Sequence, residues 1–178
     1  MGEIILLTGQ LQSGKTNLCL DIYKLAQEAR VRVGGVISPA VFEGGNKTAI
    51  DALDLKSGTR KRLAELRTSH QTDLETQHWS FYPKVVDWGN KKLEEAVPCD
   101  LLIIDELGPL EFQRSEGWVK GLDVIENGQF STALIVVRPS LIDEAVRLWQ
   151  VSRIIDLDRV TLDSSLIVDI FDSLISSL

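Results

Sequence analysis

Short apolar runs alternate with amphipathic stretches along most of this chain. The apolar runs have the length and the Val, Ile and Leu content of strands buried on both faces, and they cover residues 4–8, 33–38, 101–104, 131–137 and 151–157. Apolar residues recur at helical spacing in a second set of segments, which covers residues 15–30, 87–96, 117–127, 141–149 and 164–178. This alternation of strand and helix predicts an α/β fold built on a mainly parallel sheet.

The segment from residue 40 to residue 65 breaks the alternation. Turn signals at Gly44-Gly45-Asn46 and at Ser57-Gly58 separate short β-prone pieces, so we expect a β-hairpin insertion there. Residues 66–78 are polar and lack a clear period, which is typical of a loop. The sequence contains no repeat, linker or low-complexity tract, so residues 1–178 are predicted to form one domain.

Composition narrows the partners and the compartment that we expect. The chain has 178 residues, a formal net charge of −7 and 44% hydrophobic residues, which suits a globular protein and argues against nucleic acid as its partner. Cys19 and Cys99 form no CxxC pair and are expected to be reduced. The apolar run near the N-terminus is too short to span a membrane, so we expect a cytoplasmic protein. The oligomeric state stays open, with a monomer favoured.

The segment between the first strand and the first helix fits the pattern G-x-x-x-x-G-K-[ST] at every fixed position. A loop that follows a strand and opens a helix is the setting that phosphate binding requires. Its backbone N–H groups turn toward the phosphates, and the helix N-terminus adds the positive end of its dipole. The predicted nucleotide-binding residues are Gly9, Gln10, Leu11, Gln12, Ser13, Gly14, Lys15, Thr16 and Asn17.

Two side chains of this loop have predicted chemical roles. Lys15 is expected to reach the β- and γ-phosphates of a nucleoside triphosphate and to act in catalysis, and the Thr16 hydroxyl is expected to bind Mg²⁺. The predicted cofactor is therefore Mg²⁺. A guanine reader usually adds N-K-x-D, and neither of the two Asn-Lys pairs, at residues 46–47 and 90–91, is completed by an aspartate. Guanine specificity is therefore not supported.

A second motif follows the most apolar strand, where two acids, Asp105 and Glu106, stand side by side. Ligands of open α/β sheets bind beyond the carboxyl ends of the strands, so both acids should emerge on the same edge as the phosphate loop. Asp105 is the predicted Mg²⁺ ligand. Glu106 is the predicted general base that orients and deprotonates water; the alternative is a solvated or helix-capping acid. Glu111 either shapes the site or lies on the surface.

Positive charge for the transition state has several possible sources in the sequence. Arg138 ends a predicted strand and should face the same edge, so it is the first candidate for a γ-phosphate sensor or an internal arginine finger; the alternative is a surface arginine. Arg60-Lys61-Arg62 and Arg67 lie in the hairpin region, where a lid over the phosphates competes with a solvated face. Trp79, Phe81 and Tyr82 are expected to pack in a satellite core, with base stacking as the alternative.

Four features together resemble a known family: GQLQSGKT at residues 9–16, the pair Gly34-Gly35, the turn around Glu43-Gly44-Gly45, and IIDELGPLEF from Ile103 to Phe112. They are similar to the small nucleoside-triphosphatase family that includes thermophile NTPases and the human cancer-related NTPase. The resemblance implies a three-layer P-loop NTPase fold related to RecA and AAA-type ATPases. It also implies Mg²⁺-dependent hydrolysis of ATP, GTP and other nucleoside triphosphates to diphosphate and phosphate, with little base preference.

The resemblance extends to the site residues, with departures. Lys15, Thr16, Asp105 and Glu106 match the motif positions of the family. Asn46-Lys47 stands where arginines often follow the hairpin glycines, and Leu110 stands where methionine is frequent. Two other functions stay open: a P-loop small-molecule kinase, and a nucleotide-gated binding module with little turnover.

Overall fold

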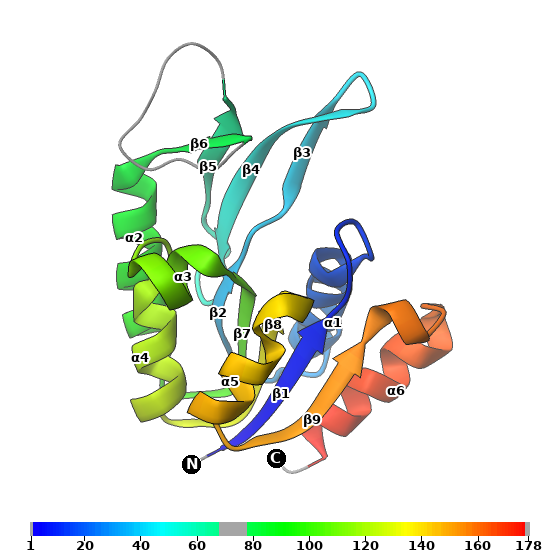
Figure 1. The fold of residues 1–178 in the computed structure, drawn as a ribbon. Helices are drawn as coiled ribbons and strands as arrows, with labels where there is room; N and C mark the ends of the chain where they lie inside the picture. Colours follow the sequence, from blue (N-terminus) through cyan, green and yellow to red (C-terminus); the bar gives the residue numbers. More distant parts are fainter. Residues whose placement is uncertain (1, 68–77, 177–178) are drawn as a thin grey trace.

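The computed structural model describes residues 2–67 and 78–176 (Figure 1). Its strands are β1 Glu3–Thr8, β2 Val33–Ile37, β3 Ala40–Glu43, β4 Asn46–Asp54, β5 Arg60–Leu66, β6 Trp79–Phe81, β7 Cys99–Leu107, β8 Phe130–Val137 and β9 Val151–Asp156. Its α-helices are α1 Lys15–Glu28, α2 Pro83–Glu95, α3 Pro109–Arg114, α4 Val119–Asn127, α5 Ile142–Leu148 and α6 Ser164–Ile175. Two 3-10 turns, η1 Pro139–Leu141 and η2 Leu157–Arg159, follow β8 and β9.

One sheet runs through the molecule in the order β6-β5-β4-β2-β7-β8-β1-β9, with β3 paired to β4. The strands β2, β7, β8, β1 and β9 are parallel, which confirms the predicted α/β fold. The predicted hairpins are the antiparallel strands β3, β4 and β5, and they extend the central sheet because β4 pairs with β2. β8 lies between β1 and β7, so the phosphate loop and the two acids emerge on either side of the end of β8.

Helices cover both faces of the sheet, which makes three layers (Figure 1). Side chains alternate along each parallel strand, so Ile4 and Leu6 of β1 face the core under α2, α4 and α5, whereas Ile5 and Leu7 face the core under α1 and α6. Both faces of these strands are therefore apolar, and burial of this area dominates the stability of the fold. The apolar stripe predicted near the C-terminus packs through α6 onto this second core.

Several elements differ from the sequence prediction. Helix α2 begins at Pro83, because proline suits the first turn of a helix, where its missing N–H has no partner to lose. Strand β7 extends beyond its apolar run and includes the two acids, and the short helix α3 follows it. The loop predicted at 66–78 lies mostly outside the described residues. None of the helices in the described ranges is long and apolar enough to cross a bilayer.

Candidate active site

Five parallel strands end at one edge of the sheet, and each delivers part of the candidate site. β1 leads into the phosphate loop, and β2 leads into Ser38. β7 carries Asp105 and Glu106 near its end, β8 is followed by Arg138, and β9 is followed by Asp158 in η2. Figure 1 shows the loop between β1 and α1 on the side toward which the β3–β4 hairpin extends. The fold therefore brings together the acids, the arginine and the loop that were predicted separately.

The phosphate loop depends on two glycines with unusual backbone angles. Gly9 has φ of 147°, and a Cβ there would lie 2.6 Å from the Oγ of Ser13. Gly14, the residue before α1, has φ of 93° and leaves the first turn of the helix without a side-chain cap. The unpaired N–H groups of that turn are the groups that bind anions. Leu11, at the tip of the loop, is 85% exposed, whereas Lys15 and Thr16 are partly buried.

The Lys15 ammonium lies inside the loop. It donates to the carbonyl oxygens of Gly9 and Gln10, both at 2.7 Å, and to the Oγ of Ser13 at 3.2 Å. Burial lowers the pKa of Lys15, whereas the nearby acids, Glu106 first, oppose that shift because they favour the charged ammonium. Lys15 therefore lies at the centre of the loop, where two loop carbonyl oxygens hold its ammonium.

Asp105 is buried directly beside Thr16. The Thr16 hydroxyl donates to Oδ1 of Asp105 at 3.3 Å, and the backbone N–H of Ser38 donates to Oδ2 at 3.0 Å. Burial, and then the neighbouring charge of Glu106, raise the pKa of Asp105 to about 6. A buried carboxylate with a strongly perturbed pKa marks a candidate functional site.

The donor set around Asp105 fits Mg²⁺. The carboxylate and the Thr16 hydroxyl are hard oxygen ligands, and the buried hydroxyl of Ser38 has no hydrogen-bond partner within the described chain. No cluster of three or more His, Cys, Asp or Glu side chains suited to a metal exists within residues 2–67 and 78–176. Mg²⁺ is usually bound by one or two carboxylates together with waters and substrate phosphates.

Glu106 sits in a β-bulge of β7. The pairing of β7 with β8 shifts register between Ile104 and Leu107, and Glu106 has φ of 69°, in the left-handed region. Non-glycine residues held there cost about 1 kcal/mol or more, and they cluster at functional sites. The bulge turns the Glu106 side chain toward solvent while Asp105 stays buried. Arg138 donates to Oε1 of Glu106 from Nε at 3.0 Å and from Nη2.

Glu111 is a buried acid, so the surface interpretation of it from the sequence is wrong. Its Oε2 accepts from the backbone N–H of Gly108 at 2.7 Å, and its Oε1 accepts from that of Trp118 at 2.8 Å. The residue is 6% exposed, and burial raises the pKa of its carboxyl. Glu111 therefore fixes the segment that follows the catalytic candidates.

Asp158 was missed in the sequence, although it belongs to the site. Both of its carboxylate oxygens accept from the backbone N–H of Gln10, at 3.0 and 2.9 Å. Its charge also acts on Lys15. It follows the last parallel strand, so the rule that singled out Arg138 at the end of its own strand applies to Asp158 too.

The basic residues of β5 do not form a lid over the phosphates. Arg60 and Arg62 both bind Asp51 of β4, at 2.7 Å each, and Lys61 lies over the ring of Trp88. The solvated-face interpretation is the correct one for these three. Trp79 and Phe81 pack against the core under α2, as expected.

A protein-family model described as NTPase matches residues 4–159, which is most of the chain. The chain belongs to the NTPase family. This membership confirms the resemblance seen in the sequence. The phosphate loop, the two acids and Arg138 all lie within the matched residues.

Curated proteins that are named nucleoside-triphosphatases are similar to this chain. Nucleoside-triphosphatase THEP1 of Methanopyrus kandleri is 30% identical over 114 residues, which cover 64% of this chain and 62% of that protein. The chain spans about three fifths of the length of the curated relatives it matches.

Two solved structures share the fold. A human cancer-related nucleoside triphosphatase gives a TM-score of 0.72 at 20% identity over 99% of this chain and 100% of that one. THEP1 of Aquifex aeolicus gives a TM-score of 0.68 at 15% identity over 96% of this chain and 98% of that one.

Proposed function

We propose that this protein hydrolyses ATP, GTP and other nucleoside triphosphates to diphosphate and phosphate, with Mg²⁺ as cofactor and little preference for the base. The observation that carries the proposal is the pair of acids at the end of β7: a buried Asp105 beside Thr16, and a solvent-facing Glu106 directly after it. A metal carboxylate next to a carboxylate that faces solvent suits attack by water. A cytoplasmic location and a monomeric state stay predictions from the sequence.

Each residue of the site has a role in that reaction. The loop amides and Lys15 hold the β- and γ-phosphates. Glu106 accepts a proton from water as the water oxygen bonds to the γ-phosphorus, while the bond from that phosphorus to the β–γ bridging oxygen breaks. Lys15 and Arg138 stabilise the negative charge that builds on the phosphate oxygens in the transition state. Thr16 and Asp105 would hold Mg²⁺, which neutralises phosphate charge when bound.

A small-molecule kinase that uses the same phosphate loop is less well supported. A kinase would need an arginine-rich lid beyond the metal carboxylate to close over an acceptor. Arg114, in the segment where that lid would lie, forms an ion pair with Glu116. A binding module with little turnover would not need the acid pair and the strained Glu106, so hydrolysis is the first activity to test.

The deciding experiment measures phosphate release from ATP, GTP, CTP and UTP with Mg²⁺ and again with excess EDTA. We expect kcat/KM values within about tenfold of one another, and no release with EDTA. Glu106→Gln should keep nucleotide affinity and lower kcat by about 10²- to 10⁴-fold, the usual contribution of a general base. Lys15→Ala should weaken binding and abolish release.

Three outcomes would contradict the proposal. Wild-type turnover in Glu106→Gln removes the base assignment. Release that needs an added acceptor, with a phosphorylated product, supports the kinase. Tight nucleotide binding without release supports the binding module.

A further inference from the structure

Lys47 is a cation of the β3–β4 hairpin with a fixed side chain. It is the second residue of β4 and lies opposite Phe42 of β3. Its Nζ sits 4.8 Å from the ring centroid of Trp79, the first residue of β6, and Trp79 in turn packs against the core. A cation over a tryptophan face is attracted by the ring, so the ammonium has a defined position although the residue is exposed.

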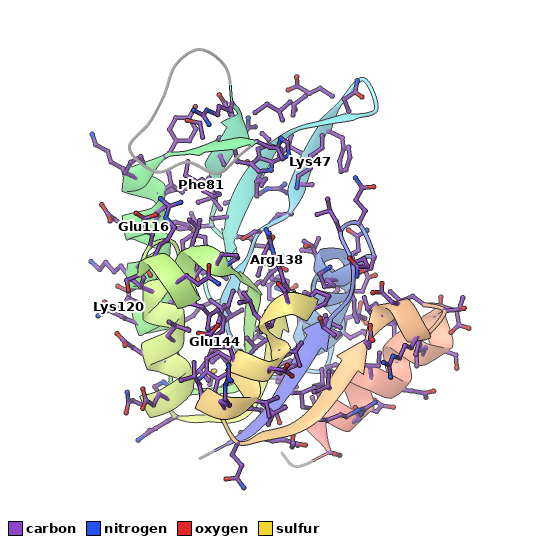
Figure 2. The ribbon with its side chains drawn as sticks, viewed as in Figure 1. Lys47, Phe81, Glu116, Lys120, Arg138 and Glu144 are labelled. Carbon is purple, nitrogen blue, oxygen red and sulfur yellow. The ribbon has the colours of Figure 1, made fainter. Side chains whose placement is uncertain are left out.

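The position of Lys47 brings it within electrostatic range of the site acids. Glu106 and then Asp105 favour its charged form, which opposes the lowering of its pKa by partial burial. Figure 2 shows Lys47 on the hairpin and Arg138 at the end of β8, on the side of the sheet where the parallel strands end. Besides Lys15 and Arg138, the site thus has a third cation, and this one lies on the hairpin and not at the end of a parallel strand.

The three cations of the neighbouring strand β5 make a useful contrast. Arg60 and Arg62 share the carboxylate of Asp51, and Lys61 lies over Trp88 with its Nζ 4.7 Å from the ring centroid. Lys61 therefore has the same cation–aromatic arrangement as Lys47, at nearly the same distance. The difference is one of place: Lys61 lies over Trp88 of α2, whereas Lys47 lies on the β3–β4 hairpin, on the side where the parallel strands end.

We propose that Lys47 is a further catalytic residue: its ammonium contacts the terminal phosphate of the bound nucleotide from the hairpin side, and Trp79 holds it in position. Phosphoryl transfer spreads negative charge over the oxygens of the terminal phosphate. A cation that is already fixed beside these oxygens stabilises that charge, and the side chain does not have to move during the reaction. The assignment rests on the proposed function, because it presumes a triphosphate in the loop.

The test compares Lys47→Met with Lys61→Met. Both changes remove an ammonium that lies over a tryptophan and keep an unbranched side chain. We measure kcat and KM for hydrolysis, and the affinities for Mg²⁺ with a non-hydrolysable triphosphate analogue and with the diphosphate. Lys47→Met should lower kcat by about 10²-fold, the scale for one lost charge-stabilising donor. It should also weaken analogue binding severalfold and leave diphosphate affinity unchanged, and Lys47→Arg should restore much of kcat.

Lys61→Met should match the wild type in every measurement. Equal behaviour of the two methionine variants would overturn the proposal, as would a Lys47→Met variant that loses analogue and diphosphate affinity equally or melts several degrees lower. If the wild type releases no phosphate, the proposed hydrolysis fails. The ratio of analogue to diphosphate affinity then still decides whether Lys47 contacts the terminal phosphate.

Discussion

The guanidinium of Arg138 donates to the carboxylate of Glu106 at 3.0 Å, which joins the end of β8 to the bulge of β7. Both side chains are about half exposed, at 51% and 46%. Exposed ion pairs contribute about 0–1 kcal/mol to stability, so this pair does little to hold the fold together. The pair matters for the position of the two side chains, because it holds a cation and the candidate base hydrogen-bonded to each other beside the phosphate loop.

Replacing Arg138 by alanine should therefore damage catalysis and spare stability. We expect kcat to fall by about 10²-fold or more, because the variant loses a transition-state cation and the partner that orients Glu106. The melting temperature should change by no more than a few degrees, as expected for a lost exposed pair. Steady-state kinetics check the loss of activity, and thermal melting of the same samples checks that stability is unchanged.

The same pair allows a double-mutant cycle. If Arg138 and Glu106 act as a unit, the variant that carries Arg138→Ala and Glu106→Gln should be little slower than Glu106→Gln alone. Independent roles would make the two losses multiply in kcat. If the two losses in kcat multiply, Arg138 acts directly on the phosphate and not by orienting Glu106.

Asp105→Asn should stabilise the metal-free protein at neutral pH while it abolishes activity. The native pKa of Asp105 lies at about 6, against an ordinary value of 3.8, so the native state binds the proton more tightly than the unfolded state. Stability is then lost as pH rises from about 4 to about 6, and two pKa units correspond to about 3 kcal/mol. Asparagine has no buried charge and so avoids this loss of stability, and its side-chain oxygen can still accept the hydrogen bond from the backbone N–H of Ser38.

Chemical denaturation in EDTA at two pH values checks the sign of this change in stability with pH. The Asn variant should be more stable than the wild type at pH 8, and the gain should shrink toward zero at pH 4. An equal gain at both pH values would assign the effect to packing instead of ionisation. Added Mg²⁺ should stabilise the wild type alone.

Site residues whose place depends on local spacing along the chain were predictable from the sequence. The phosphate loop and Asp105 are examples, since each follows a recognisable apolar strand. The conformation of Glu106 was not predictable, because its bulge arises from the pairing of β7 with β8. Lys47 and Trp79 meet only after β4, β5 and β6 have formed, so no local pattern reports their contact.

Asp158 was overlooked for a related reason. Its role is to accept from the amide of Gln10, and that contact joins residues 148 positions apart. A single acid after a strand looks like a solvated surface residue until the strand order places β9 beside β1. The strand order depends on packing of the whole sheet and cannot be inferred from the spacing of a few residues.

Two substitutions of Asp158 separate its hydrogen bond from its charge. Asp158→Ala leaves the Gln10 amide without its acceptor, so the loop should be less well ordered and nucleotide affinity should fall about tenfold, equivalent to about 1.4 kcal/mol. Asp158→Asn keeps an acceptor and removes a negative charge near the phosphates, so its affinity should equal or exceed that of the wild type. Titration calorimetry with Mg²⁺ and the diphosphate distinguishes the two; equal affinities for both variants would mean that the contact is not important for binding.

Glu111 provides the clearest prediction about stability, because it is buried and accepts from two backbone amides, those of Gly108 and Trp118. Glu111→Ala leaves both amides unpaired, at a cost of about 1–3 kcal/mol each, so unfolding free energy should fall by about 3 kcal/mol. Glu126→Ala, which removes an exposed acid from α4, serves as the matched control and should stay within about 0.5 kcal/mol of the wild type. Urea unfolding at pH 8 measures both. Equal midpoints for the two variants would mean that the segment after β7 does not depend on the buried carboxylate.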